Sequence, residues 1–134
     1  MVGPNPPVTS DIPTPRAGEA VSGPAVVVGM DESLEVVRNR LREQGERFAA
    51  VRQGGRITAV VDRDRLDRPH HGGSVESLAV RDVVHPGTVC VFEDTPLPVV
   101  ARLVRIARIP AIPVLDRWHR LIGLLTADDL TRWE

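Results

Sequence analysis

Short runs of β-branched and apolar residues alternate with longer amphipathic stretches along the chain. Residues 24–28 (PAVVV) and 88–92 (TVCVF) are too short and too β-branched for helices, and we predict a strand at each. The stretch after residue 31 repeats apolar residues at Leu34, Val37 and Leu41, which predicts a half-buried helix. A second helix is predicted from residue 94, where apolar residues occur on almost every side.

Two hairpins follow these helices. FAAVR and GRITAVV are separated by QGG, and AIPVLD and RLIGLL are separated by RWH, a pattern typical of paired antiparallel strands. The segments DRDRL and TADDL then predict short closing helices. Residues 31–66 and 94–130 align with one gap and eight identical positions. The fold class is therefore α/β (α+β), with two βαββα repeats packed about a pseudo-twofold axis.

Proline and turn residues set the expected boundaries. Six of the twelve prolines lie in residues 1–24, so we expect a flexible tail over residues 1–22. The first repeat is expected at 23–68, a linker rich in turn residues at 69–77, and the second repeat at 78–134.

The second central helix is apolar on more sides than one repeat can cover. Val99, Val100, Leu103, Val104 and Ile106 are interrupted only by arginines. We expect a second copy of the chain to bury this face, giving a homodimer.

Composition excludes several classes of protein. The formal net charge is -1, which disfavours general nucleic-acid binding. All 17 basic residues are arginine, so no lysine nucleophile or phosphate-loop lysine is present. Cys90 is the single cysteine and fits a reducing compartment. Because the sequence shows neither a signal peptide nor a membrane span, the cytoplasm is the expected location.

Catalytic and metal-binding patterns are missing. No nucleophile elbow or zinc-protease motif occurs, so we expect no enzymatic activity. His70 and His71 are adjacent in a Gly-rich loop, but their side chains diverge and no further ligand spacing supports a metal site.

Thr126 and Asp129 are the first candidate ligand-binding residues. They begin a helix directly after a strand, where free backbone N–H groups favour an anionic group. Asp129 can accept hydrogen bonds from ribose hydroxyls, and Thr126 can donate one to a phosphate. The alternative is a capping box, in which the two side chains only cap the helix.

Residues 93–130 resemble the CBS domain, through the helix start EDTPLP, the strand IPVLD and the closing GLLTADDL. The preceding LAVRDVVHPG is similar to the family's usual lead-in, and residues 59–66 resemble the end of a diverged first repeat. The resemblance implies a CBS pair, or Bateman module. Such modules bind adenosine-containing ligands between their repeats, usually dimerise and rarely catalyse reactions.

Further site residues follow from the resemblance. It implies that Thr88, Val89, Ile112 and Pro113 line an adenine slot, although core packing is a strong alternative for them. It also places Arg105 and Arg108 near phosphates, where the alternative is a solvated stripe with Arg102.

The first repeat departs from the family pattern. Asp62 and Arg65 stand where Thr126 and Asp129 stand in the second repeat. A carboxylate repels phosphate, and arginine cannot accept hydrogen bonds from ribose. We therefore expect at most one competent nucleotide site per chain.

The leading hypothesis is a stand-alone regulatory module that binds AMP, ATP or S-adenosylmethionine and signals to an unidentified partner protein. No cofactor is implied beyond that regulatory ligand. The competing hypothesis is a dimerisation or interaction scaffold with vestigial ligand sites. A metal-dependent enzyme built on the histidines is a distant third.

Overall fold

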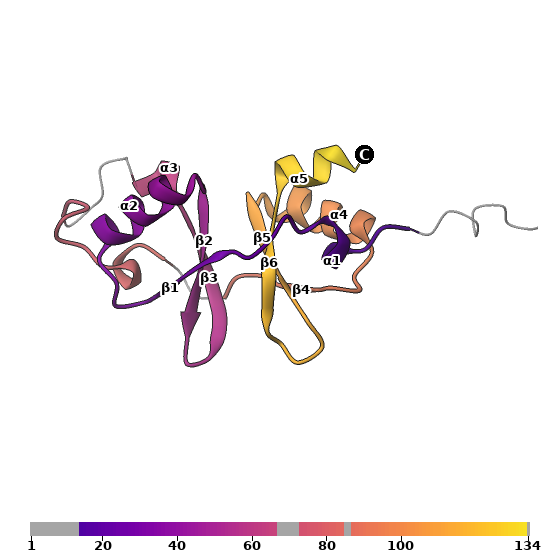
Figure 1. The fold of residues 1–134 in the computed structure, drawn as a ribbon, viewed down its shortest axis with the longest axis horizontal. Coiled ribbons are helices and arrows are strands. Elements are labelled where there is room, and N and C mark those ends of the chain that lie inside the picture. The colour runs from indigo at the N-terminus through magenta and orange to yellow at the C-terminus, as the bar shows by residue number, and fades with distance from the viewer. Residues whose placement is uncertain (1–13, 67–72, 85–86, 134) are drawn as a thin grey trace, which may run out of the picture.

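The computed structural model describes residues 14–66, 73–84 and 87–133. Two three-stranded sheets form its centre, each with helices packed beside it (Figure 1). Residues 69–72 of the predicted linker, which include His70 and His71, lie outside the described residues. No helix of the described part is long and apolar enough to cross a membrane.

The first repeat contains β1 (Val26–Gly29), α2 (Leu34–Gln44), β2 (Phe48–Gln53), β3 (Arg56–Asp62) and α3 (Arg63–Leu66). Strand β1 pairs with β2 in parallel, and β2 pairs with β3 in antiparallel orientation. Helix α2 begins where the Ser33 side chain accepts a hydrogen bond from the Glu35 N–H, 3.2 Å away. It ends at Gly45, whose φ of 66° is the left-handed conformation that glycine adopts readily.

The second repeat has the same order and pairing. It contains β4 (Val91–Phe92), α4 (Leu97–Ala107), β5 (Ala111–Leu115), β6 (Leu121–Thr126) and α5 (Ala127–Arg132). The predicted βαββα duplication is confirmed. Both hairpins extend toward the same end of the molecule, and α3 and α5 lie at the opposite end (Figure 1).

Strand β4 is shorter than the run 88–92 predicted. The N–H groups of Gly87 and Thr88 donate instead to the Thr58 carbonyl of β3, at 2.9 and 3.1 Å. This part of the chain is bound to the first repeat before it reaches its own sheet.

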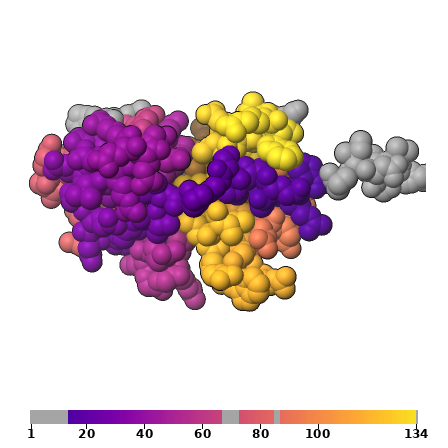
Figure 2. Space-filling view, viewed as in Figure 1, coloured from indigo at the N-terminus to yellow at the C-terminus, as the bar shows by residue number. Residues whose placement is uncertain are grey.

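The tail prediction is wrong for residues 14–22. Helix α1 (Ala17–Ala20) packs against the second repeat, with Ala17 and Ala20 buried in the core that contains Val91 and Leu125. Three backbone hydrogen bonds hold it: the Ala17 and Gly18 N–H groups donate to the Thr95 and Glu93 carbonyls, both at 2.8 Å, and the Leu97 N–H donates to the Pro15 carbonyl at 2.9 Å. After α1, the N-terminal segment crosses the front of the molecule from the second repeat to the first (Figure 2).

The lead-in of the second repeat makes the reciprocal contact. Val75 and Val80 are buried in the core of the first repeat, and η2 (Val80–Asp82) lies beside it. Here the Leu34 N–H donates to the Leu78 carbonyl at 3.0 Å. Residues 75–84 therefore complete the first core, whereas the sequence predicts that 78–84 belong to the second repeat. Each repeat contributes a lead-in segment to the core of the other.

Helix α4 buries Leu97 and Val100 but leaves other apolar side chains in solvent. Val99 is 46% exposed and Ile106 is 75% exposed. The exposed face expected from the sequence is present in the single chain. Its burial by a second copy remains a prediction.

Candidate functional site

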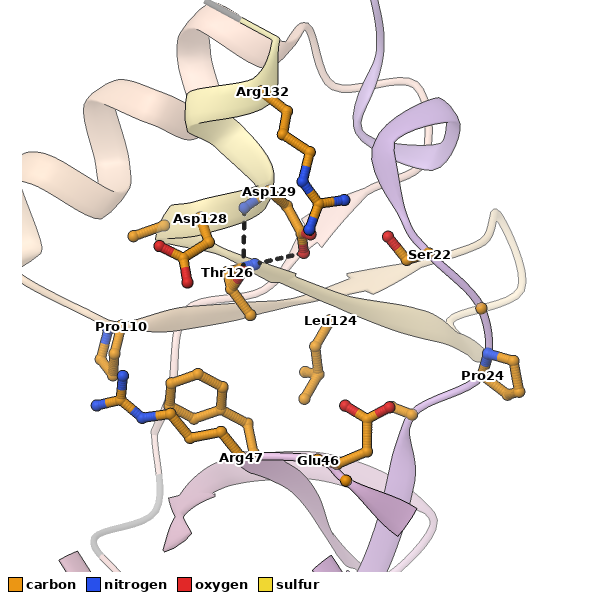
Figure 3. A pocket seen from close by; sticks show the side chains of 15 residues that line it. Ser22, Pro24, Glu46, Arg47, Pro110, Leu124, Thr126, Asp128, Asp129 and Arg132 are labelled. Atoms are coloured by element: carbon orange, nitrogen blue, oxygen red, sulfur yellow. Dashed lines mark hydrogen bonds and ion pairs between the residues drawn. The ribbon is translucent and has the colours of Figure 1, made fainter. Parts of the chain in front are cut away.

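A cleft of about 490 Å³ lies between the repeats. One wall is the start of α5, and the other is the turn that leads from α2 into β2 (Figure 3). The segment 22–25, which enters β1, closes one side. The lining residues are Ser22, Gly23, Pro24, Ala25, Gly45, Glu46, Arg47, Phe48, Pro110, Leu124, Thr126, Ala127, Asp128, Asp129 and Arg132.

Thr126 and Asp129 form a reciprocal capping box on the α5 wall. The Asp129 N–H donates to Thr126 Oγ1 at 3.1 Å, and the Thr126 N–H donates to Asp129 Oδ2 at 3.0 Å (Figure 3). The capping alternative is therefore confirmed as a structural role. It also fixes the Asp129 carboxylate at the edge of the cleft.

Asp129 retains acceptor capacity after capping. The residue is only 8% exposed, and its Oδ1 lies 3.6 Å from the Arg132 guanidinium. A carboxylate offers about four lone pairs, and the cap uses one of them. Asp129 can therefore accept hydrogen bonds from a ligand hydroxyl without losing the cap.

Arg47 projects from the opposite wall but is already paired. Its Nε and Nη2 atoms donate to the two Asp62 oxygens, each at 3.0 Å, and Nε lies 3.2 Å from Asp64. The guanidinium also stacks over the Phe48 ring, 4.8 Å from its centroid. The hydrogen bonds to Asp62, with smaller contributions from the charges of Asp62, Asp64 and Asp128, raise the pKa of Arg47. The side chain stays cationic and oriented.

Acidic groups outnumber basic groups in this cleft. Glu46, Asp128 and Asp129 line it together with Arg47 and Arg132. Since the Arg47 fork is bound to Asp62, the field inside the cleft is not strongly positive. The arrangement suits a polar ligand of low negative charge more than a polyphosphate.

The structure brings only part of the predicted site together. Thr126 and Asp129 line the cleft, whereas Thr88, Val89, Arg108, Ile112 and Pro113 do not. Ile112 and Pro113 are fully buried in β5, which agrees with the alternative that they pack in the core. Val89 is exposed, and Thr88 binds the Thr58 carbonyl.

The arginines of the second central helix also stay outside. Arg102, Arg105 and Arg108 are all exposed, and Arg108 ends α4 with a φ of 54°. Their exposure agrees with the alternative that these arginines form a solvated stripe.

Asp62 has a structural role in the first repeat. Its Oδ1 accepts from the Asp64 N–H at 3.0 Å while both oxygens bind Arg47. Arg65 is exposed. A carboxylate neutralised in this way is not available to a ligand.

Sequence reasoning missed the residues that face Thr126 and Asp129 across the cleft. Glu46, Arg47 and segment 22–25 belong to the first repeat, more than seventy positions earlier in the chain. The expected pseudo-twofold packing was the signal that could have revealed these residues. Such packing places the start of the second strand of one repeat against the end of the third strand of the other.

Metal ligands do not gather in this structure. Within residues 14–66, 73–84 and 87–133, no group of three or more His, Cys, Asp or Glu side chains could hold an ion. His119 instead packs edge-on against Phe92, with ring centroids 5.3 Å apart.

The second repeat matches a known protein family. The family model of the CBS domain matches residues 80–134, which include the whole α5 wall. The first repeat has the same order of elements and the same strand pairing as the second. Residues 80–134 are therefore similar to a CBS domain.

Known CBS proteins align over most of the chain. A CBS domain-containing protein of Dictyostelium discoideum is 29% identical over 115 residues, covering 77% of this chain and 79% of its own. The CBS-pair protein CBSX2 from Arabidopsis thaliana has a TM-score of 0.73 at 21% identity, covering 90% of this chain and 94% of its own.

A further similar structure is longer. The cytosolic domain of the Mg²⁺ channel MgtE, solved in complex with ATP, has a TM-score of 0.72 at 26% identity. The alignment covers 88% of this chain and 48% of that one, so the present chain spans about half of its length. CBS domains are generally regulatory rather than catalytic.

Proposed function

We propose that this CBS pair is a regulatory module that binds one adenosine-containing ligand in the cleft beside α5. The observation that carries the proposal is the Asp129 carboxylate, which is fixed by Thr126, largely buried and still able to accept hydrogen bonds. It lies within the residues that match the CBS family model.

The cleft offers a place for each part of such a ligand. Asp129 accepts from ribose hydroxyls. Pro24, Pro110 and Leu124 provide apolar surface for a base, and Arg132, exposed on α5, donates to a phosphate. The volume of about 490 Å³ lies within the range of small-molecule sites.

The charge of the cleft selects among the adenosine ligands. Glu46 and Asp128 repel additional phosphates, and Arg47 is already bound to Asp62. We therefore favour AMP or S-adenosylmethionine over ATP. Bound ligands in similar structures support the class: CBSX2 was solved in complex with AMP, and MgtE with ATP.

A ligand in this cleft would touch both repeats. It would contact α5 of the second repeat together with Glu46 and segment 22–25 of the first. Binding would favour one relative position of the repeats, and a partner protein would recognise the repeats in that position. We place this module in the cytoplasm as a homodimer without catalytic activity.

A thermal-shift screen against AMP, S-adenosylmethionine and ATP tests the proposal. A ligand at 100 times its Kd stabilises the native state by about 2.7 kcal/mol, which raises Tm by on the order of 10 °C. AMP or S-adenosylmethionine is expected to give the larger rise. Asp129→Asn keeps an acceptor for the Thr126 N–H but places an amide where ribose requires carboxylate oxygen, so the shift should be lost.

Asp82→Asn is the matched control. Asp82 also accepts a capping hydrogen bond, from the Ala79 N–H at 2.9 Å, but it lies outside the cleft. It should retain the full shift. No shift in the unmodified protein at millimolar ligand, or equal shifts in both variants, would contradict the proposal.

One observation favours the scaffold alternative. The exposed Val99 and Ile106 of α4 form an apolar face suited to contact with a second copy. If the chain is a scaffold, light scattering will show a dimer that Ile106→Glu dissociates, while no adenosine ligand shifts Tm.

A further inference from the structure

A second cleft lies at the opposite end of the molecule, between the hairpin tips. Its volume is about 680 Å³. The β2–β3 and β5–β6 hairpins extend side by side toward this end (Figure 1). The lining residues are Arg52, Gly54, Gly55, Arg56, Ile57, Leu115, Trp118, His119, Arg120 and Leu121. None of them lines the Asp129 cleft.

Guanidinium groups dominate this cleft. Arg52 comes from the end of β2, Arg56 from the start of β3 and Arg120 from the loop before β6. Arg56 and Arg120 occupy equivalent positions in the two repeats. No acidic side chain is among the lining residues. The symmetry of the repeats thus places guanidinium groups from both hairpins in one cleft.

Arg52 and Arg56 have free guanidiniums. Within the described residues, neither makes an ion pair or a side-chain hydrogen bond, and both are exposed. By contrast, Arg120 Nε donates to Asp116 Oδ2 at 2.9 Å. The two unpaired arginines carry charge that an anion can neutralise.

The loop 116–120 holds its part of the cleft in place. Asp116 Oδ1 accepts from the Trp118 and Arg120 N–H groups, both at 2.9 Å. The guanidiniums of Arg117 and Arg120 each lie 4.9 Å from the centre of the Trp118 ring. The Arg120 side chain is therefore oriented before any ligand arrives, which lowers the entropic cost of binding.

We propose that this hairpin cleft binds a polyphosphate anion. Arginine forks match phosphate oxygens in geometry and charge, and three separate chain segments supply them here. The cleft is larger than one phosphate fills, so linked phosphates contact Arg52, Arg56 and Arg120 together. This site is independent of the adenosine cleft, whose acidic lining disfavours the same ligand.

Trp118 gives a direct measurement. The chain has two tryptophans, so Trp133→Phe leaves Trp118 as the single emitter. Titration of this variant with inorganic triphosphate at constant ionic strength should change Trp118 fluorescence, with an affinity at least tenfold higher than for inorganic phosphate. Asp129→Asn in the same background should bind triphosphate equally well.

Two charge-matched double variants test whether triphosphate binds at Arg52 and Arg56. Arg52→Gln with Arg56→Gln should weaken triphosphate binding at least tenfold, because each removes a phosphate contact. Arg102→Gln with Arg105→Gln makes the same change in net charge on exposed arginines of α4 and should leave affinity unchanged. Equal losses in the two double variants, no loss in the first, or equal affinities for phosphate and triphosphate would overturn the proposal.

Discussion

Asp62 and Thr126 occupy equivalent positions at the ends of β3 and β6, yet Asp62 binds an arginine side chain and Thr126 caps a helix. Asp62 pairs in register with Phe48 and binds the Arg47 fork through both oxygens. Thr126 pairs with Ala111 and accepts the Asp129 N–H. One repeat therefore ends in a closed ion pair, and the other ends in a cap that leaves a carboxylate facing a cleft.

The ion pair of the first repeat should stabilise its end. Asp62→Ala removes the Arg47 contacts and the hydrogen bond to the Asp64 N–H, and is expected to cost about 1–2 kcal/mol in unfolding free energy. Urea denaturation measures this cost. Arg47→Ala should cost less, about 0.5–1 kcal/mol, because that side chain is half exposed. The reverse order of the two costs would contradict this role for Asp62.

The exchanged lead-in segments should stabilise the whole pair. Ala17→Asp places a carboxylate in the core of the second repeat, where Ala17 is 0% exposed, and is expected to cost about 3 kcal/mol or more. Ala107→Asp, the same substitution at an exposed position of α4, should cost well under 1 kcal/mol. Thermal unfolding compares the two. Similar Tm values would show that residues 14–20 do not contribute to the core.

Gly123 links the packing of β6 to the shape of the adenosine cleft. A Cβ atom there would lie within 2.9 Å of the Gly23 carbonyl and would overlap the Val21 side chain. Gly123→Ala should therefore displace segment 21–23, cost about 1–3 kcal/mol and weaken AMP binding. Gly29→Ala, where the nearest atom would be 3.9 Å away, is the control. Calorimetric titration of AMP should show the loss in the first variant alone.

Asp116 should make stability depend on pH. Burial acts to raise the pKa of Asp116, but hydrogen bonds from the Arg120 and Trp118 N–H groups and the Arg120 guanidinium outweigh it and lower the pKa. A lowered folded-state pKa contributes stability above the unfolded value of about 3.9, which is lost as pH falls through the folded value. Asp116→Asn should therefore be less stable at neutral pH and lose less stability between pH 5 and 2. Parallel acid-unfolding curves for the two proteins would contradict this role.

Local patterns explain why much of the fold was predictable. The strands, the central helices and the Thr126–Asp129 cap depend on residues within a few positions of one another, so periodicity and motif spacing reveal them. Helix α1 was missed because Ala17 and Ala20 give little hydrophobic signal beside many prolines. Their burial depends on a surface that residues 91–130 create.

The site was only half predictable for the same reason. Thr126 and Asp129 belong to one motif, whereas Glu46 and Arg47 reach the cleft through packing between the repeats. The sequence predicts a strand at Thr88 and Val89, and the family resemblance implies an adenine slot there. The Thr88 N–H donates instead to the Thr58 carbonyl of the first repeat. Such contacts between repeats leave no trace in local spacing.

The central claim is that each chain has one adenosine site, which contains Asp129. The equivalent position in the first repeat does not bind a ligand, because Asp62 there is bound to Arg47. Isothermal titration calorimetry with AMP tests it most directly, with Asp129→Asn and Asp82→Asn measured beside the unmodified protein. We predict a stoichiometry of about one per chain, lost in Asp129→Asn and retained in Asp82→Asn. Two equal sites per chain, or binding that survives in Asp129→Asn, would contradict the account.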